Sequence, residues 1–139
     1  MDRLDAYVAF FETIRRDNLN ALDALVTPDV RFKDPFNDVT GVDKMRAALA
    51  MAFDHGTPRF TVRDKARGAA GAYLLWHYDQ GNGFAFDGMS EIRFAPDGRI
   101  CAHIDHWDAS REVYAKLPVI GWLVRLVQAR LKVPSGRRA

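Results

Sequence analysis

The side chains best suited to chemistry lie near the end of the sequence, between Ile100 and Asp108. Successive side chains of a β-strand point to opposite faces. An extended conformation therefore places His103, Asp105 and Trp107 on one face, with His103 and Asp105 roughly 7 Å apart along the strand. An imidazole, a carboxylate and a large aromatic ring are groups that a proton-transfer site in an apolar pocket uses. We interpret this face as one wall of a candidate site.

Asp34 is a second candidate acid–base residue. It follows the alternating residues Val30 to Lys33 and precedes Pro35, which cannot donate a hydrogen bond to a strand ladder, so a strand should end here. The alternative is that Asp34 only bonds nearby backbone at the strand exit. In the same way, His103 and Asp105 could be a satisfied buried pair that fixes the sheet.

His77 adds a further imidazole. In the alternating stretch 73–79, Tyr73 and His77 share one face, which we expect to be the inner one. His77, His103 and Asp105 together would match the two imidazoles and one carboxylate that hold non-haem iron. We favour a site that uses neither a metal nor another cofactor.

Composition restricts the class of protein. The chain has 139 residues, of which 48% are hydrophobic, which suits one compact domain. A net charge of only +2 argues against nucleic-acid binding. The single cysteine, Cys101, cannot form an internal disulfide and fits a cytoplasmic protein. We expect no signal peptide and no membrane span.

Helices are expected first and strands afterwards. Apolar residues at helical spacing predict helices over about 4–14, 19–26 and 42–53, with a short strand around Val30 and Phe32. Four more strands are predicted at roughly 59–67, 72–79, 84–95 and 99–108, joined by short turns. This order is typical of an α+β domain with helices packed on one side of a curved, mainly antiparallel sheet.

The C-terminal segment is expected to add a helix. We assign residues 1–108 to the domain proper and 109–139 to an amphipathic helix and short basic tail of the same unit, with an interruption at Leu117 and Pro118. A basic amphipathic helix can lie on a membrane. Such helices more often dock on their own domain, and we expect no membrane contact here.

The strands carry too many aromatic residues for one buried face. Trp76 and Tyr78 alternate with Tyr73 and His77, so we expect Trp76 and Tyr78 to face outward and to pack against a second copy. The alternative is that the C-terminal segment covers this face.

Three motifs, together with the order of elements, resemble the nuclear transport factor 2-like superfamily. The closest branches are the SnoaL-like and ketosteroid isomerase-like ones. The motifs are Val30–Pro35, Gly41–Met45 and Glu91–Ile100. The resemblance implies a cone of three N-terminal helices and a strongly curved sheet around a deep apolar pocket, with the outer sheet face used for homodimerisation.

The resemblance also implies site residues. Asp34 stands where ketosteroid isomerases keep the carboxylate that shuttles a proton, and His103, Asp105 and Trp107 fall on pocket-facing positions. In SnoaL-like polyketide cyclases the base is an aspartate on the last strand, which Asp105 resembles in position.

Two hydrogen-bond donors of ketosteroid isomerases are replaced. Phe10 stands at the position of the tyrosine that donates to the developing oxyanion, and Ser90 at that of the protonated aspartate. His77, Ser90 or His103 could supply other donors.

Two functions remain open at this point. The first is an isomerase- or cyclase-like enzyme that abstracts a proton next to a carbonyl, with Asp34 or Asp105 as the base, His103 as its partner, and Phe10, Tyr73, His77, Ser90 and Trp107 binding a steroid- or polyketide-like substrate. The second is a non-catalytic domain that binds an apolar ligand or dimerises.

Overall fold

The structure is a computed structural model that describes residues 1–132. The basic tail expected from Pro134 to Ala139 lies outside the described residues. The chain divides into two compact units, Met1–Trp107 and a second unit that begins at Asp108.

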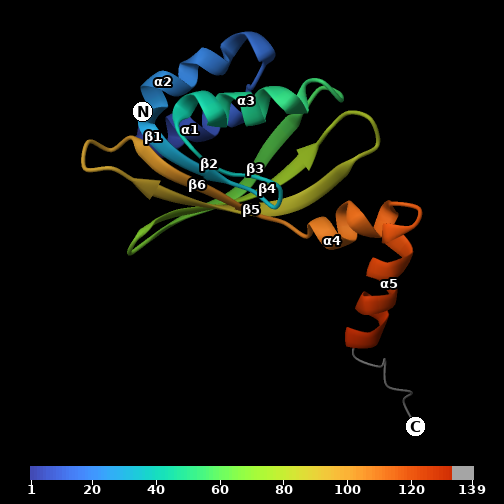
Figure 1. Ribbon diagram of the computed structural model, residues 1–139. Coiled ribbons are helices and arrows are strands. Elements are labelled where there is room, and N and C mark those ends of the chain that lie inside the picture. Colours follow the sequence, from blue (N-terminus) through green and yellow to red (C-terminus); the bar gives the residue numbers. More distant parts are fainter. Residues whose placement is uncertain (133–139) are drawn as a thin grey trace. The chain divides into compact units, whose positions relative to one another are not determined.

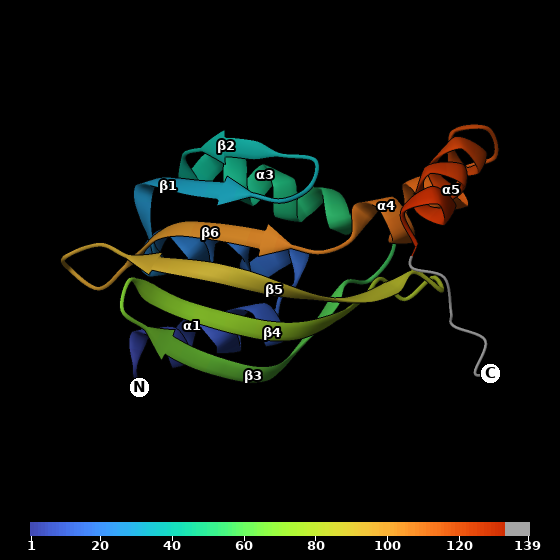
Figure 2. The same ribbon diagram turned by 90° about the horizontal axis from the view of Figure 1, so that it is seen from below.

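A six-stranded sheet forms the framework of the first unit, in the order β2-β1-β6-β5-β4-β3 (Figure 2). Only the β1–β6 pairing is parallel, and the other neighbours are antiparallel. The strand bounds are β1 Val26–Lys33, β2 Asp38–Thr40, β3 Arg59–Gly68, β4 Gly71–Asp79, β5 Ala85–Phe94 and β6 Ile100–His106.

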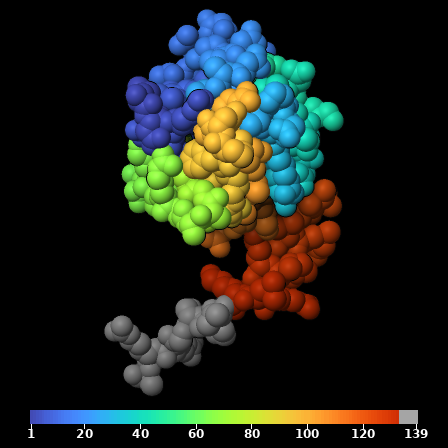
Figure 3. Space-filling model, turned by 90° about the vertical axis from the view of Figure 1, so that its left-hand side faces the viewer, coloured from blue at the N-terminus to red at the C-terminus, as the bar shows by residue number. Residues whose placement is uncertain are grey.

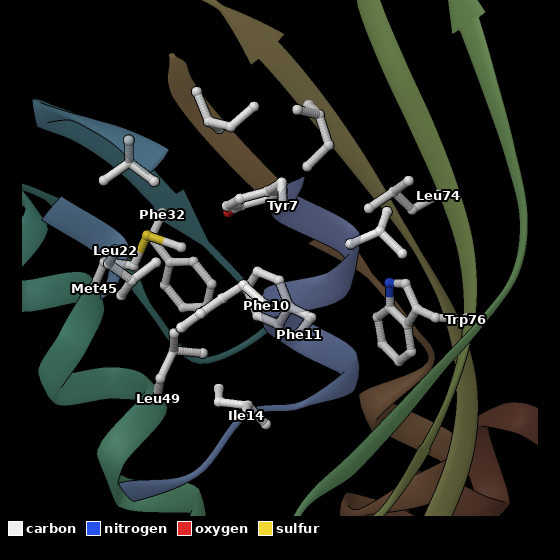
Figure 4. Packing of buried hydrophobic residues seen from close by; sticks show 14 of the residues in the cluster. Tyr7, Phe10, Phe11, Ile14, Leu22, Phe32, Met45, Leu49, Leu74 and Trp76 are labelled. Carbon is white, nitrogen blue, oxygen red and sulfur yellow. The ribbon is translucent and has the colours of Figure 1, made fainter. Parts of the chain in front are cut away.

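Helices cover one face of this sheet (Figure 1). They are α1 Arg3–Glu12, the 3-10 helix η1 Arg16–Ala21 with α2 Leu22–Leu25, and α3 Val42–Ala52. Rings of α1 fill the space between α3 and the sheet, as Figure 4 shows for Tyr7, Phe10 and Phe11 beside Met45, Leu49, Leu74 and Trp76. The predicted α+β cone is confirmed.

One end of the cone is closed by the N-terminus. The turn after β3, the turn after β5 and the first residues of the chain lie side by side (Figure 3). Arg67 forms an ion pair with Asp2, and the side chain of Arg3 lies against Gly98. Gly98 has φ +85°, a backbone conformation that favours glycine in this tight turn.

The first strand differs from the prediction. The helical spacing of Leu22 and Leu25 suggested that Val26 continues the helix, but α2 ends at Leu25 and β1 begins at Val26. Pro28 lies inside β1, where the pairing with β6 is irregular between Val26 and Arg31, so it costs no ladder bond. The three-residue edge strand β2 was predicted as a loop.

The orientation predicted for β4 was wrong. Trp76 is 5% exposed and belongs to the core together with Leu74 and Tyr78, whereas Leu75 is exposed on the outer face. Because apolar residues stand at both odd and even positions, alternation alone does not identify the inner face. Trp76 and Tyr78 therefore cannot form the expected contact with a second copy.

The second unit contains α4 Ala109–Glu112, the 3-10 helix η2 Tyr114–Lys116 and α5 Ile120–Leu131. The helical segment is interrupted at Leu117 and Pro118, as predicted, because proline disfavours a helical conformation of the residue before it. In residues 1–132, no helix is long and apolar enough to cross a membrane.

Candidate functional site

His103 lies at the centre of the cone interior, on β6. Its side chain is enclosed by the rings of Tyr7, Phe11 and Phe32, whose centroids lie 5.2 to 5.7 Å from the imidazole. His103 is 3% exposed, so each ring nitrogen needs a partner within the protein.

Both ring nitrogens of His103 have such a partner. Nε2 lies 2.7 Å from Oδ1 of Asp105, and Nδ1 lies 2.7 Å from the hydroxyl of Tyr7. A carboxylate only accepts hydrogen bonds, so Nε2 carries the proton. In the neutral imidazole Nδ1 then accepts from Tyr7. Burial, with the charge of Asp105, raises the pKa of Tyr7 well above its usual value, so its hydroxyl stays protonated and donates.

Ser90 connects the same carboxylate to the next strand. Its hydroxyl accepts a hydrogen bond from the indole Nε1 of Trp76 at 2.8 Å and donates to Oδ1 of Asp105 at 2.5 Å. The sheet register produces this contact, because Ser90 on β5 stands opposite Asp105 on β6. We call Tyr7, Trp76, Ser90, His103 and Asp105 the buried polar network.

The cavity beside the network is small. Its volume is about 10 Å³, at the lower limit for holding one water molecule. Its walls are Phe11, Phe60, Val62, Leu74, Trp76, Ser90, His103 and Asp105. The deep apolar pocket implied by the resemblance is thus filled by aromatic side chains.

Asp105 connects the network to an open pocket. Its side chain is 14% exposed, and Asp105 is one of the residues that line a shallow pocket of about 260 Å³ at the end of β6. We call this the mouth pocket. Its lining residues are Lys33, Asp34, Pro35, Ile104, Asp105, His106 and Trp107. Asp34 and Asp105, the two predicted acid–base residues, therefore both line this pocket.

Asp34 is held by the loop that it begins. Its Oδ1 accepts hydrogen bonds from the backbone amides of Phe36 at 2.8 Å and Asn37 at 2.7 Å, and the Asn37 side chain donates to both carboxylate oxygens. An aspartate that bonds the amide two residues ahead forms an Asx-turn. This is the strand-exit role considered above as the alternative for Asp34.

The predicted binding residues separate into two groups. Ser90 belongs to the network, Trp107 stacks on Phe86 at the mouth pocket with ring centroids 4.1 Å apart, and Phe10 is buried in the core. The expectation that Tyr73 and His77 face the interior was wrong, because the reversed orientation of β4 places both side chains on the outer face of the sheet.

His77 is paired on that outer face. Its Nδ1 lies 2.8 Å from Oδ1 of Asp87, on the opposite side of the sheet from His103. It therefore cannot join His103 and Asp105 in an iron site. Within residues 1–132, no group of three or more His, Cys, Asp or Glu side chains is arranged to hold a metal ion.

Tyr7 belongs to the buried polar network, although the sequence pattern did not indicate it. Its position fits the apolar stripe of the first helix. A phenol hydroxyl on a buried stripe needs a hydrogen-bond partner, and this requirement would have indicated a polar group facing Tyr7.

Comparisons with known proteins identify the family. The sequence profile of the SnoaL-like domain matches residues 7–103, which include Tyr7, Ser90 and His103. The chain belongs to the SnoaL-like domain family. No curated protein matches the sequence significantly.

Solved structures share the fold of this SnoaL-like protein at low identity. A nuclear transport factor 2-like protein of unknown function from Exiguobacterium is 19% identical, with a TM-score of 0.65 over 76% of this chain and 98% of that one. A steroid delta-isomerase from Pseudomonas aeruginosa is 20% identical, with a TM-score of 0.64 over 93% and 91%.

A third structure was solved with a bound small molecule. It is a protein with a ketosteroid isomerase-like fold from Catenulispora acidiphila, in complex with trimethylamine. It is 20% identical, with a TM-score of 0.66 over 86% of this chain and 95% of that one. At these identities the comparisons establish the fold, and the chemistry must be argued from the site.

Proposed function

We propose that this SnoaL-like protein catalyses proton transfer next to the carbonyl group of a small apolar substrate, without a cofactor, and that Asp105 is the base. The observation that carries this proposal is the position of Asp105 between the buried polar network and the mouth pocket. A carboxylate fixed by protein donors and open to a pocket on its other side is suited to general base catalysis.

The hydrogen bonds of Asp105 support its choice over Asp34. Within residues 1–132, the side-chain hydrogen bonds of Asp105 are all made by Oδ1, which leaves Oδ2 to meet a substrate. The carboxylate of Asp34 holds its own loop with both oxygens. We assign Asp34 the role of shaping the mouth pocket.

The reaction proposed is enolisation. The Asp105 carboxylate takes a proton from the carbon next to the carbonyl, the electron pair of that C–H bond forms a C=C bond, and the π pair of the carbonyl moves to its oxygen. Lys33 lines the same pocket, and its ammonium group would favour the developing negative charge. Return of the proton to another carbon completes an isomerisation. In a cyclisation the enolate carbon instead attacks a second carbonyl of the same molecule, and the new alkoxide takes the proton back from Asp105.

His103, Ser90 and Tyr7 are positioning residues in this proposal. They touch Asp105 or each other and do not line the mouth pocket. Donors that are already in place need no reorganisation when the carboxylate changes charge, which lowers the barrier to proton transfer.

The pocket also indicates the size of the substrate. At about 260 Å³ it lies just below the range of roughly 300–1,000 Å³ typical of sites for drug-sized ligands. Pro35, Ile104 and Trp107 supply apolar walls. A ketone or lactone smaller than a steroid fits these dimensions better than a steroid does.

A non-catalytic domain is the second candidate function. The filled interior favours it, because a cavity of about 10 Å³ admits no organic ligand. In that case the buried polar network only fixes the sheet to α1.

An exchange experiment separates the two functions. The protein is incubated in D2O with a panel of enolisable ketones, β-keto esters and lactones, and loss of the α-proton signal is followed by NMR. Catalysed exchange that is lost in Asp105→Asn supports the enzyme. Asp87→Asn is the matched control, because it alters a His–Asp pair on the outer sheet face. If no compound exchanges faster than in buffer, the non-catalytic function stands.

A further inference from the structure

The second unit has an apolar surface that nothing within that unit covers. In α5 the face turned toward α4 and η2 carries Gly121, Arg125 and Gln128. The Gln128 side chain donates to Ser110 at 2.9 Å, and Arg125 bonds the carbonyl of Ala115. A Cβ at Gly121 would lie only 2.7 Å from that carbonyl oxygen, so the helix can approach this closely only with glycine.

The opposite face of α5 is exposed and apolar. Trp122 is 60% exposed, and its neighbours on this face are also large and exposed. We call this the apolar face of α5, formed by Ile120, Trp122, Leu123, Leu126, Val127 and Leu131. Within this unit the helix thus packs by its polar side and leaves its apolar side uncovered, the reverse of an ordinary surface helix.

The charged side chains from Val113 onward are all positive. From Val113 to the end of the sequence there is no Asp or Glu, whereas Lys116, Arg125, Arg130, Lys132, Arg137 and Arg138 are basic. Arg130 stands four residues after Leu126 and three after Val127, so it shares their side of the helix. A partner that complements this face therefore has an apolar layer for the large side chains and negative charge for the basic ones.

We propose that the apolar face of α5 docks on an anionic lipid surface. Apolar side chains would enter the boundary between headgroups and acyl chains, while Arg130 and Lys132 reach lipid phosphates. With 12 residues the helix is about 18 Å long at 1.5 Å per residue, too short for the roughly 30 Å hydrocarbon core, so it lies on the membrane and does not cross it.

The same charges disfavour a second copy of the helix as the occupant. Pairing two apolar faces would bring Arg130 into the contact without a carboxylate from either copy of the segment. A phosphate-bearing surface supplies the missing negative charge. Docking on a lipid surface differs from the expectation, drawn from the sequence, that the C-terminal helix makes no membrane contact.

The test is flotation of the full chain with vesicles of phosphatidylcholine alone or mixed with phosphatidylglycerol. We expect binding to the mixed vesicles, a decrease in binding with added salt, and a blue shift of Trp122 fluorescence that bromine-labelled lipids quench. Arg130→Gln should weaken binding about fivefold, the effect of removing one cation near an anionic surface.

Val127→Glu should abolish binding, and Met51→Glu on α3 is its control because the two residues are 58% and 59% exposed. The proposal is overturned if mixed vesicles fail to bind the protein, or if Met51→Glu weakens binding as much as Val127→Glu. It is also overturned if Val127→Glu converts a dimer to a monomer in a sizing column without vesicles.

Discussion

The imidazole of His103 and the carboxylate of Asp105 lie on the same strand with Nε2 and Oδ1 2.7 Å apart, yet only Asp105 lines an open pocket. The two side chains therefore differ in role although they form one hydrogen-bonded pair. His103 is fixed between Tyr7 and Asp105 within the core, and Asp105 also belongs to the residues that line the mouth pocket.

Removal of the Tyr7 hydroxyl tests the network as a structural unit. Tyr7→Phe leaves Nδ1 of the buried His103 without its partner and should lower the free energy of unfolding by about 1–3 kcal/mol. Urea denaturation measures this change. Tyr73→Phe on the outer face is the matched control, with an expected effect within about 0.5 kcal/mol. Equal losses in the two variants would contradict the role of Tyr7.

The buried phenols make stability depend on alkaline pH. Burial raises the pKa of Tyr7 well above its usual value, and burial with the charge of Asp79 raises the pKa of Tyr78 from 10.0 to about 12. Above pH 10 the unfolded chain loses these protons while the folded protein keeps them, so rising pH favours unfolding.

Stability should thus be unaffected by these groups below about pH 10 and should fall from about pH 10 to 12. Urea midpoints measured across this window check the fall, and Tyr7→Phe should make it shallower. A fall of the same steepness in Tyr7→Phe would show that the hydroxyl of Tyr7 ionises as freely in the folded protein as in the unfolded chain.

Gly88 provides the space for the Trp76 ring. A Cβ at Gly88 would lie 2.3 Å from that ring, and Trp76 holds Ser90. Gly88→Ala should therefore destabilise the protein by about 1–3 kcal/mol through overpacking. Thermal melting measures the change, and the smaller ring in Gly88→Ala with Trp76→Phe should recover part of it. No recovery in the double variant would mean that the clash lies elsewhere.

We propose a homodimer through the outer sheet face, with contacts from Leu75 and Met89. Both are large, apolar and exposed on neighbouring strands, where they stand opposite each other in the sheet. Leu75→Glu with Met89→Glu should shift the protein to monomer in a sizing column, because buried charge without a partner opposes association. A wild-type monomer, or an unchanged dimer in the variant, would exclude this interface.

Several elements could be predicted because local chemistry determines them. Pro35 ends β1 after Lys33, Gly41 with φ +114° is the N-cap that precedes α3, and Gly98 lies in the turn after β5 with φ +85°. Each of these constraints acts over a few residues, so the sequence shows it directly.

The inner face of β4 could not be predicted in this way. Trp76 and Leu75 are both apolar, and their orientation is decided by the contact of Trp76 with Ser90 and Gly88 on β5. Such pairing joins residues that are far apart in the sequence. The pair of His103 and Asp105 was predictable because two residues of one strand share a face.

The most direct test of Asp105 as the base is the rate of α-proton exchange in wild type, Asp105→Asn and Asp34→Asn, on a substrate that the wild type turns over. With Asp105 as the base, we expect a loss of at least about 100-fold in Asp105→Asn, the lower end of the contribution of a general base. Asp34→Asn should stay close to wild type, because Asn retains an oxygen that can accept from the amides of Phe36 and Asn37. Exchange that survives in Asp105→Asn and disappears in Asp34→Asn would contradict the assignment of Asp105 as the base.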